Sequence, residues 1–226
     1  MYGDLSGTAT WEELMEFTNG AWNSMEYEKR AATIEEYKLH LEEKRRQMQE
    51  TAHRRAWEAL CPPEYRNTIY EELPNVTKFE EVQRWQYGPI GLLLVGPTRQ
   101  GKTRSVWKLL ERLYFNEKRK IKVFTPMDLK LEVANAWRDA ETAEDFVSEL
   151  RHVGVLFFDD LDTVKFTEAV EETIYDAFEF RPTHEKPVIA TVNRTGRELA
   201  ARMNANGRGA KIVERMREFC RVINFT

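Results

Sequence analysis

The chain has 226 residues, and its 34 lysines and arginines against 38 aspartates and glutamates leave a formal net charge of −4. This charge excludes a uniformly basic nucleic-acid coat protein but leaves room for a local basic patch. The only two cysteines, Cys61 and Cys220, are far apart, which excludes a disulfide framework and a cysteine zinc site and is typical of a reducing compartment. Residues 1–20 lack an apolar run and the longest apolar stretches are too short to span a bilayer, so we expect a cytoplasmic protein without membrane attachment.

Residues 1–60 differ from the rest, with eight basic and twelve acidic residues and no proline. Thr10 and Glu13 fit a capping box, which predicts that a short helix begins there. After Gly20, about forty residues contain no helix breaker until Cys61–Pro63, and such a run predicts one long helix.

One narrow apolar row follows this predicted long helix. Its members recur every seven residues and are Tyr27, Ile34, Leu41 and Met48. The neighbouring row is interrupted by the charged residues Lys38 and Arg45. The pattern suits a solvated helix lying against the main domain or a docking helix for a partner, with a self-associating coiled coil as a third interpretation.

Residues 61–226 alternate short apolar runs with helix-like stretches. The apolar runs are Gly91–Val95, Ile121–Phe124, Val153–Phe158, Val188–Val192 and Arg221–Phe225. Apolar strands without polar alternation, separated by helices, predict a parallel sheet covered on both faces. Within the connecting segment 64–89 we expect a short helix near Thr77–Trp85. The predicted organisation is a helical arm over residues 1–60 and an α/β domain over residues 61–226.

The segment that follows the first apolar run matches the phosphate-loop pattern G-x-x-x-x-G-K-[ST] at every fixed position. Glycines there let backbone amides turn toward phosphates, and the N-terminus of the following helix adds partial positive charge. Lys102 would neutralise β- and γ-phosphate oxygens, and Thr103 would hold Mg²⁺ through its hydroxyl. The predicted ATP-binding residues are Gly96, Pro97, Thr98, Arg99, Gln100, Gly101, Lys102 and Thr103.

Two more apolar runs end in polar residues suited to the same chemistry. Asp159 and Asp160 follow Val153–Phe158, and adjacent carboxylates are costly unless a cation lies between them. Asp159 would act on Mg²⁺, directly or through its water, while Asp160 would orient and deprotonate the attacking water. Asn193 follows Val188–Val192, where its amide would either help to position the water or merely cap the strand.

The C-terminal stretch is basic, since residues 194–226 hold eight basic and three acidic residues. Arg215 lies in a predicted helix that leads into the last apolar run. An arginine at the edge of an ATPase subunit can enter a neighbour's site and stabilise transition-state charge. A basic, solvated helix is the alternative interpretation.

Together these features resemble the AAA+ ATPases of the DnaC/IstB type, which are bacterial and phage replicative helicase loaders and helpers of transposition. The phosphate loop and the paired acids occur in many families, whereas the final helix and strand discriminate, because most AAA+ proteins continue from there into a helical lid. The segments that carry the resemblance are Pro62–Arg66, Gly96–Thr103, Phe124–Leu129, Phe157–Leu161, Thr191–Asn193, Lys211–Met216 and Cys220–Phe225.

The resemblance implies an α/β, P-loop AAA+ three-layer sandwich with a five-stranded parallel sheet, no C-terminal lid and an N-terminal helical arm. It implies that subunits associate in a ring or spiral with ATP between them, with Asn193 as the sensor and Arg215 as an arginine finger acting in trans. The implied function is an ATP-hydrolysing helicase loader of DNA replication. Its implied partners are a hexameric replicative helicase, bound through the arm, and single-stranded DNA.

The same resemblance assigns single-stranded DNA binding to the region Met127–Trp137 and the helix after it. Lys130 and Arg138 are the candidate contacts to the DNA backbone, and the basic turn Lys118–Lys122 is another. A solvated surface is the alternative interpretation of all of them.

The sequence departs from the family's pattern at two positions, because glycine is frequent in the family where Arg99 and Asp162 stand here. The main alternative function is an IstB-like transposition helper that binds duplex DNA and a transposase. An AAA+ initiator, a P-loop small-molecule kinase and a nucleotide-sensing adaptor with little turnover are further alternatives.

Overall fold

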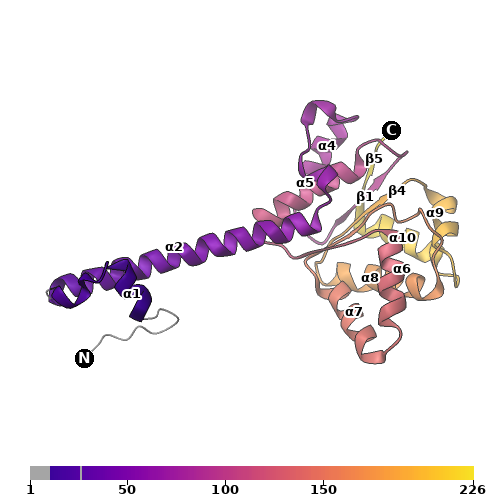
Figure 1. The fold of residues 1–226 in the computed structure, drawn as a ribbon. Coiled ribbons are helices and arrows are strands. Elements are labelled where there is room, and N and C mark those ends of the chain that lie inside the picture. The colour runs from indigo at the N-terminus through magenta and orange to yellow at the C-terminus, as the bar shows by residue number, and fades with distance from the viewer. Residues whose placement is uncertain (1–10, 26) are drawn as a thin grey trace. The chain divides into compact units, whose positions relative to one another are not determined.

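The computed structural model describes residues 11–25 and 27–226. The chain divides into two compact units, Met1–Ala59 and Leu60–Thr226 (Figure 1). Thr10, the first residue of the predicted capping box, lies outside the described residues.

The first unit is a small helical structure made of α1 (Trp11–Phe17), the 3-10 helix η1 (Ala21–Ser24) and α2 (Tyr27–Leu60). The predicted long helix is present as α2, with 34 residues. Its apolar row is used in part within the chain, because Ile34 and Leu41 pack against a buried cluster of Leu14, Trp22 and Tyr37. Partly buried side chains pack around this cluster, and these are Met15, Phe17, Ile34 and Leu41.

A chain reversal allows α1 to pack on α2. Gly20 adopts φ +75°, a left-handed conformation that costs glycine little, and its amide donates to the Met15 carbonyl at 2.8 Å, which closes the end of α1. Farther along α2, Met48 keeps 65% of its surface exposed. Within the first unit, the last member of the apolar row is therefore exposed to solvent.

The second unit is built on a five-stranded, all-parallel sheet, as predicted. The order across the sheet is β2-β3-β4-β1-β5. The strands are β1 (Gly91–Val95), β2 (Ile121–Phe124), β3 (Val155–Phe158), β4 (Val188–Val192) and β5 (Cys220–Asn224). Every residue of β1, β3 and β4 is buried, which explains why these strands read as continuous apolar runs.

Helices cover both faces of the sheet and complete three layers (Figure 1). On one face, Trp107 of α5 (Lys102–Phe115) meets Phe157 of β3 edge to face. On the other, Leu93 and Phe158 join one large core with side chains from the helices that follow β2. Those helices are α6 (Pro126–Ala136), α7 (Ala140–His152), α8 (Glu168–Thr183), α9 (Gly196–Met203) and α10 (Gly209–Phe219).

The segment before β1 is more helical than predicted. The expected helix near Thr77–Trp85 is present as α4 (Val76–Gln83), and Asn75 caps it by accepting the Lys78 amide at 3.1 Å. Two short elements come before it, α3 (Pro63–Arg66) and the 3-10 helix η2 (Tyr70–Glu72).

Strand β3 begins at Val155 and not at Val153 as predicted, because a buried arginine binds the backbone just before the strand. Arg181 of α8 is fully buried, and it donates to the carbonyl oxygens of Leu150 at 2.6 Å, Val153 at 3.0 Å and Pro187 at 2.8 Å. The guanidinium thereby joins the segments that lead into β3 and β4.

Both cysteines are free and buried. Burial raises the pKa of Cys61 to about 11 and that of Cys220 to about 12, so their thiols stay protonated and unreactive at neutral pH. Across residues 11–25 and 27–226, none of the helices combines the length and apolar character needed to cross a bilayer.

Candidate active site

The site lies where three strands end side by side. Val95 of β1 pairs with Val192 of β4, and Phe158 of β3 pairs with Ala190. The loops after β1, β3 and β4 therefore start at the same edge of the sheet, where α/β proteins bind ligands. The Gly96 amide donates to the Val192 carbonyl at 3.2 Å.

The loop after β1 has the backbone shape that its glycines allow. A Cβ on Gly96 would lie 2.2 Å from the Phe225 carbonyl oxygen, so no larger residue fits there. Gly101 adopts φ +87° directly before α5, and the first amides of that helix are thereby free to face an anion. Arg99, which stands where the resembled family often has glycine, adopts φ +64°.

Lys102 is drawn into the centre of the site and is only 4% exposed. Its Nζ donates to the carbonyl oxygens of Gly96 at 2.7 Å and Pro97 at 2.8 Å and to Asn193 Oδ1 at 2.9 Å. Burial lowers the pKa of Lys102, while the negative charges of the nearby aspartates oppose this shift. The ammonium group thus stands inside the loop, where it can meet phosphate oxygens.

Asp159 and Thr103, the two predicted metal ligands, are in direct contact. Asp159 Oδ1 accepts the hydroxyl of Thr103 at 2.7 Å and that of Thr191 at 2.7 Å. Burial raises the pKa of Asp159, and the two hydroxyl donors oppose the shift. A carboxylate and a hydroxyl oxygen at the end of a phosphate loop form the hard-oxygen donor set that Mg²⁺ prefers, so these residues fit that ion.

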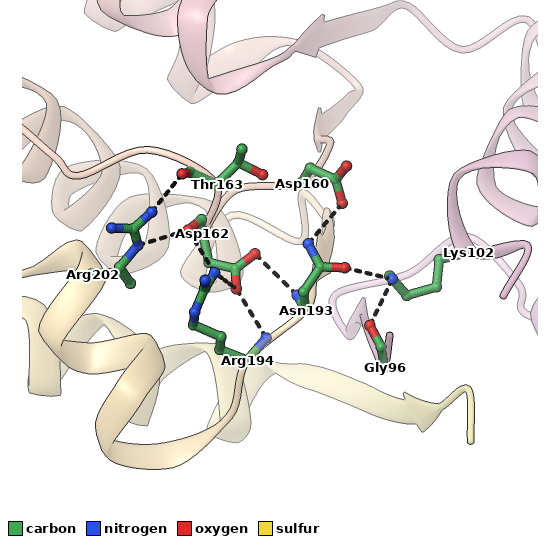
Figure 2. A network of polar contacts seen from close by, with 8 residues as sticks. All are labelled: Gly96, Lys102, Asp160, Asp162, Thr163, Asn193, Arg194 and Arg202. Carbon is green, nitrogen blue, oxygen red and sulfur yellow. Dashed lines mark hydrogen bonds and ion pairs between the residues drawn. The ribbon is translucent and has the colours of Figure 1, made fainter. Parts of the chain in front are cut away.

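Asn193 connects the predicted base to the lysine that is predicted to bind phosphate. Its Nδ2 donates to Asp160 Oδ1 at 3.3 Å, and its Oδ1 accepts from Lys102 Nζ at 2.9 Å (Figure 2). Asp160 adopts φ +48°, a conformation that aspartate tolerates better than most residues, and its amide donates to Thr191 Oγ1 at 2.7 Å. The residues after β1, β3 and β4 therefore form one connected group.

Two residues of this group were not predicted from the sequence. Thr191 is fully buried and contacts both adjacent aspartates; its signals in the sequence were a hydroxyl inside an otherwise apolar run and its place in the segment Thr191–Asn193, but it was given no role. Asp162 is also fully buried and accepts the backbone amides of Asn193 and Arg194.

A cavity of about 560 Å³ opens on the phosphate loop. Its far wall comes from the segment before β1, where Tyr65 stacks on Trp107 at 6.2 Å and lies under the guanidinium of Arg104 at 5.6 Å. The lining residues are Glu64, Tyr65, Glu72, Pro74, Thr98, Arg99, Gly101, Lys102, Thr103, Arg104 and Asp160. Cation, hydroxyl and carboxylate groups meet at the loop end, and the segment before β1 adds an aromatic ring, a proline and two glutamates to the wall.

Arg215 is not joined to the phosphate loop by any contact found among the described residues. It lies on α10, where its guanidinium donates to Glu179 at 2.6 and 3.1 Å and to Glu218 at 2.8 Å. Its predicted action in a neighbouring subunit therefore stays a prediction.

The comparisons with known proteins concern the fold. No protein-family model matches the chain. No curated protein matches it.

Several solved structures do match. A DnaC helicase loader is 20% identical with a TM-score of 0.55, over 71% of this chain and 92% of that one. DnaI is 20% identical with a TM-score of 0.57, over 74% of this chain and 95% of that one. The replication initiator DnaA, bound to AMPPCP and single-stranded DNA, is 14% identical with a TM-score of 0.54 over 72% of this chain.

The chain spans half of the DnaA chain but nearly all of the DnaC and DnaI chains. At 14% to 20% identity, these likenesses show a shared fold. Residues Leu60–Thr226 contain a five-stranded parallel sheet covered by helices, and in its fold the chain is similar to the solved structures of a helicase loader, DnaI and a replication initiator.

Proposed function

We propose that the chain is an AAA+ ATPase that hydrolyses ATP. The observation that carries this proposal is the bridge from Asp160 through Asn193 to Lys102, which joins a candidate base to a candidate phosphate-binding cation. Lys102 and the amides at the start of α5 would bind the phosphates. Asp160 would accept the proton of the attacking water while Asn193 orients that water. Thr103 and Asp159 would hold Mg²⁺, which neutralises phosphate charge when bound.

The substitution Asp160→Asn tests this assignment. It keeps the shape of the side chain but removes the base, so ATP turnover should fall about 10²- to 10⁴-fold while ATP still binds. Lys102→Ala is the contrasting variant, because it should weaken ATP binding itself. Turnover of Asp160→Asn at the wild-type rate, measured as phosphate release, would show that the assigned base is wrong.

We further propose that this ATPase is a replicative helicase loader acting in DNA replication. The likeness to a DnaC helicase loader over 92% of that chain supports the proposal. The first unit would be the helicase-binding arm, since Leu39 and Met48 of α2 are 57% and 65% exposed on a helix that is otherwise strongly charged. An IstB-like transposition helper is the alternative, because it would share the ATPase domain.

The mass of the complex formed with the hexameric replicative helicase of the same host, with and without ATP, distinguishes these functions. A helicase loader should co-migrate with the helicase, and Met48→Glu should weaken the complex if α2 is the contact. Glu58→Gln, near the C-terminal end of α2, serves as the control. A preference for duplex DNA with no helicase contact would favour the transposition helper.

Single-stranded DNA is the second proposed partner, and α6 is the element that best suits it. Met127 and Leu131 are each 57% exposed one helical turn apart, and Trp137 directly after the helix is 48% exposed. Exposed aromatic and apolar side chains can stack on unpaired bases. Lys130 is partly buried and Arg138 is exposed beside them.

The basic turn Lys118–Lys122 is less suited to DNA than its sequence suggested. Lys122 forms ion pairs with Glu132 at 3.0 Å and Glu149 at 3.2 Å, and Arg119 lies 3.7 Å from the ring centre of Tyr87. Part of the positive charge is therefore already matched within the chain.

Fluorescence anisotropy with an oligothymidine tests the α6 surface. Trp137→Ala should weaken binding about 5-fold or more, because stacking on one base contributes about 1–3 kcal/mol. Ile90→Ala removes a comparably exposed apolar side chain elsewhere and should leave binding unchanged. Equal affinities of the two variants would remove α6 from the DNA interface.

A further inference from the structure

Asp162 is a buried carboxylate in contact with the backbone of Asn193, the asparagine with the predicted sensor role. Its side chain is fully buried, and Oδ1 accepts the backbone amide of Asn193 at 3.0 Å. Oδ2 accepts the backbone amide of Arg194 at 2.9 Å and the Arg194 guanidinium at 3.2 Å (Figure 2). All three donors come from the two residues that directly follow β4.

The rest of this turn is tied down by contacts that do not involve the carboxylate. Arg202 of α9 donates to the carbonyl oxygens of Asp162 at 3.2 Å and Thr163 at 2.6 Å. A substitution of Arg202 can therefore loosen the turn without changing the charge on Asp162. Comparing the two kinds of variant distinguishes an effect on the turn from an effect on Asn193.

A buried carboxylate is expensive unless strong donors surround it. Here a guanidinium and two amides do so, and hydrogen bonds to an ionised acceptor are roughly twice as strong as those between neutral groups. The Asn193 peptide is thus held by a charge-assisted hydrogen bond at the point where the chain leaves the sheet. The direction of that peptide determines where the Asn193 side chain can reach.

Asn193 must reach two groups at once, Asp160 at 3.3 Å and Lys102 at 2.9 Å. We infer that Asp162 is a positioning residue, which holds the Asn193 backbone so that the amide side chain stays between Asp160 and Lys102. This inference rests on the proposed ATPase function and deepens it. Asp162 acts through Asn193 and would itself touch neither nucleotide nor water.

The expected consequence concerns turnover more than binding. A displacement of about 1 Å in a catalytic group can reduce turnover roughly 10²-fold. Asp162→Asn keeps the size of the side chain but loses the charge and turns an acceptor into a donor facing Arg194. We expect kcat to fall about 10-fold or more, with KM for ATP changed less than about 2-fold.

A double-mutant cycle with Asn193→Ala tests whether Asp162 acts through Asn193. If it does, Asp162→Asn should cost about 10-fold in the wild-type background but less than about 2-fold when Asn193 is alanine. Arg202→Gln is the matched control, because it loosens the same turn without touching the carboxylate, and it should leave kcat within about 2-fold of wild type. The inference would be overturned if Asp162→Asn reduced kcat equally in both backgrounds, or if Arg202→Gln reduced kcat as much as Asp162→Asn does. Asp162 would then have a merely structural role.

Folding is checked by the thermal midpoint of each variant and by binding of a fluorescent ATP analogue. If Asp162→Asn does not fold, Arg194→Gln replaces it, since this change removes the charged partner and leaves the carboxylate in place. A smaller loss of kcat that again depends on Asn193 is then expected, and its absence overturns the inference. A wild-type chain without ATP turnover would instead overturn the proposed function, and this inference with it.

Discussion

Arg99 and Asp160 both stand on left-handed backbone at the edge of the site, with φ of +64° and +48°. For residues other than glycine this conformation costs about 1–2 kcal/mol. Asp160 gains contacts from it, because its amide meets Thr191 and its carboxylate meets Asn193. Arg99 is exposed, and no described contact explains its presence in place of glycine.

Replacing Arg99 by glycine should therefore stabilise the protein. Relief of the left-handed strain outweighs the added freedom of the unfolded chain, and we expect a gain of up to about 1 kcal/mol in the free energy of unfolding. Urea denaturation measures it. Gln100→Gly in the same loop is the control, since Gln100 does not have a positive φ and glycine there should cost about 0.5–1 kcal/mol. A destabilised Arg99→Gly variant would contradict the strain argument.

Asp159 makes stability depend on pH in a defined direction. Burial raises the pKa of Asp159 in the folded state. Its contribution to the free energy of unfolding is therefore fully present below the unfolded pKa of about 3.9, and it is lost as the pH rises through the folded pKa. Asp159→Asn removes this loss and should be more stable than wild type at neutral pH, by a margin that opens above about pH 4. Urea midpoints across a pH series measure the margin, and a margin independent of pH would refute the linkage.

Asp159→Asn should also gain less stability than the wild type when Mg²⁺ and ATP are added. Together they should raise the thermal midpoint of the wild type, because a ligand that binds only the folded state stabilises it. Asp159→Asn should show a smaller rise, since one of the two proposed metal ligands is altered. Equal rises of the thermal midpoint in the two proteins would show that Asp159 does not bind the metal.

The helix α8 holds the entry of two central strands through a single side chain. Arg181 donates to carbonyl oxygens on the segment between α7 and β3 and on Pro187 just before β4. Burial lowers its pKa to about 10, which leaves it charged at neutral pH. The charge is stabilised by peptide dipoles, so nothing in the local sequence marked this residue as structural.

Arg181→Met should lower the free energy of unfolding by about 3 kcal/mol or more, because several buried carbonyl groups lose their donor. The corresponding fall in thermal midpoint is about 6–12 °C for a domain of this size. Arg151→Met is the matched control, since Arg151 pairs with Asp176 at a partly exposed site and should cost less than about 1 kcal/mol. Similar losses for both variants would show that the buried carbonyl contacts of Arg181 are not what stabilises the strands.

Across the whole molecule, one chain supplies the phosphate loop, the paired acids and Asn193, while Arg215 is held on α10 by Glu179 and Glu218. An arginine finger acting in trans would have to exchange these carboxylates for a neighbour's phosphates. Both ion pairs are partly exposed, and solvent screening makes the contribution of such pairs to stability small. The exchange would therefore be energetically inexpensive.

Mixing inactive subunits tests the composite site. An equal mixture of Lys102→Ala and Arg215→Ala chains should recover about a quarter of wild-type ATPase activity, because some sites combine an intact Lys102 with a neighbour's Arg215. A mixture of Lys102→Ala and Asp160→Asn chains should recover nothing, since both residues belong to the same chain's site. Lack of recovery in the first mixture, with both chains folded and associated, would argue against a trans role for Arg215.

The elements were predictable where the signal was local. The phosphate loop, the five apolar strands and the breaker-free run of α2 were each visible in a short stretch of sequence, because backbone conformation there depends on neighbouring residues. The packing of Leu14 and Trp22 on Tyr37 was not visible. It depends on a chain reversal at Gly20 that brings α1 back along α2.

The sequence by itself determined which chemistry gathers at the strand ends: Lys102, Thr103, Asp159, Asp160 and Asn193 each follow a recognisable local pattern. Tertiary structure decided how these groups are held. Thr191 bridges the two adjacent aspartates, and Asp162 holds the Asn193 peptide across about thirty residues of sequence. Such pairings follow from the register of β3 against β4, and a register is set by the packing of the whole sheet and not by any one segment.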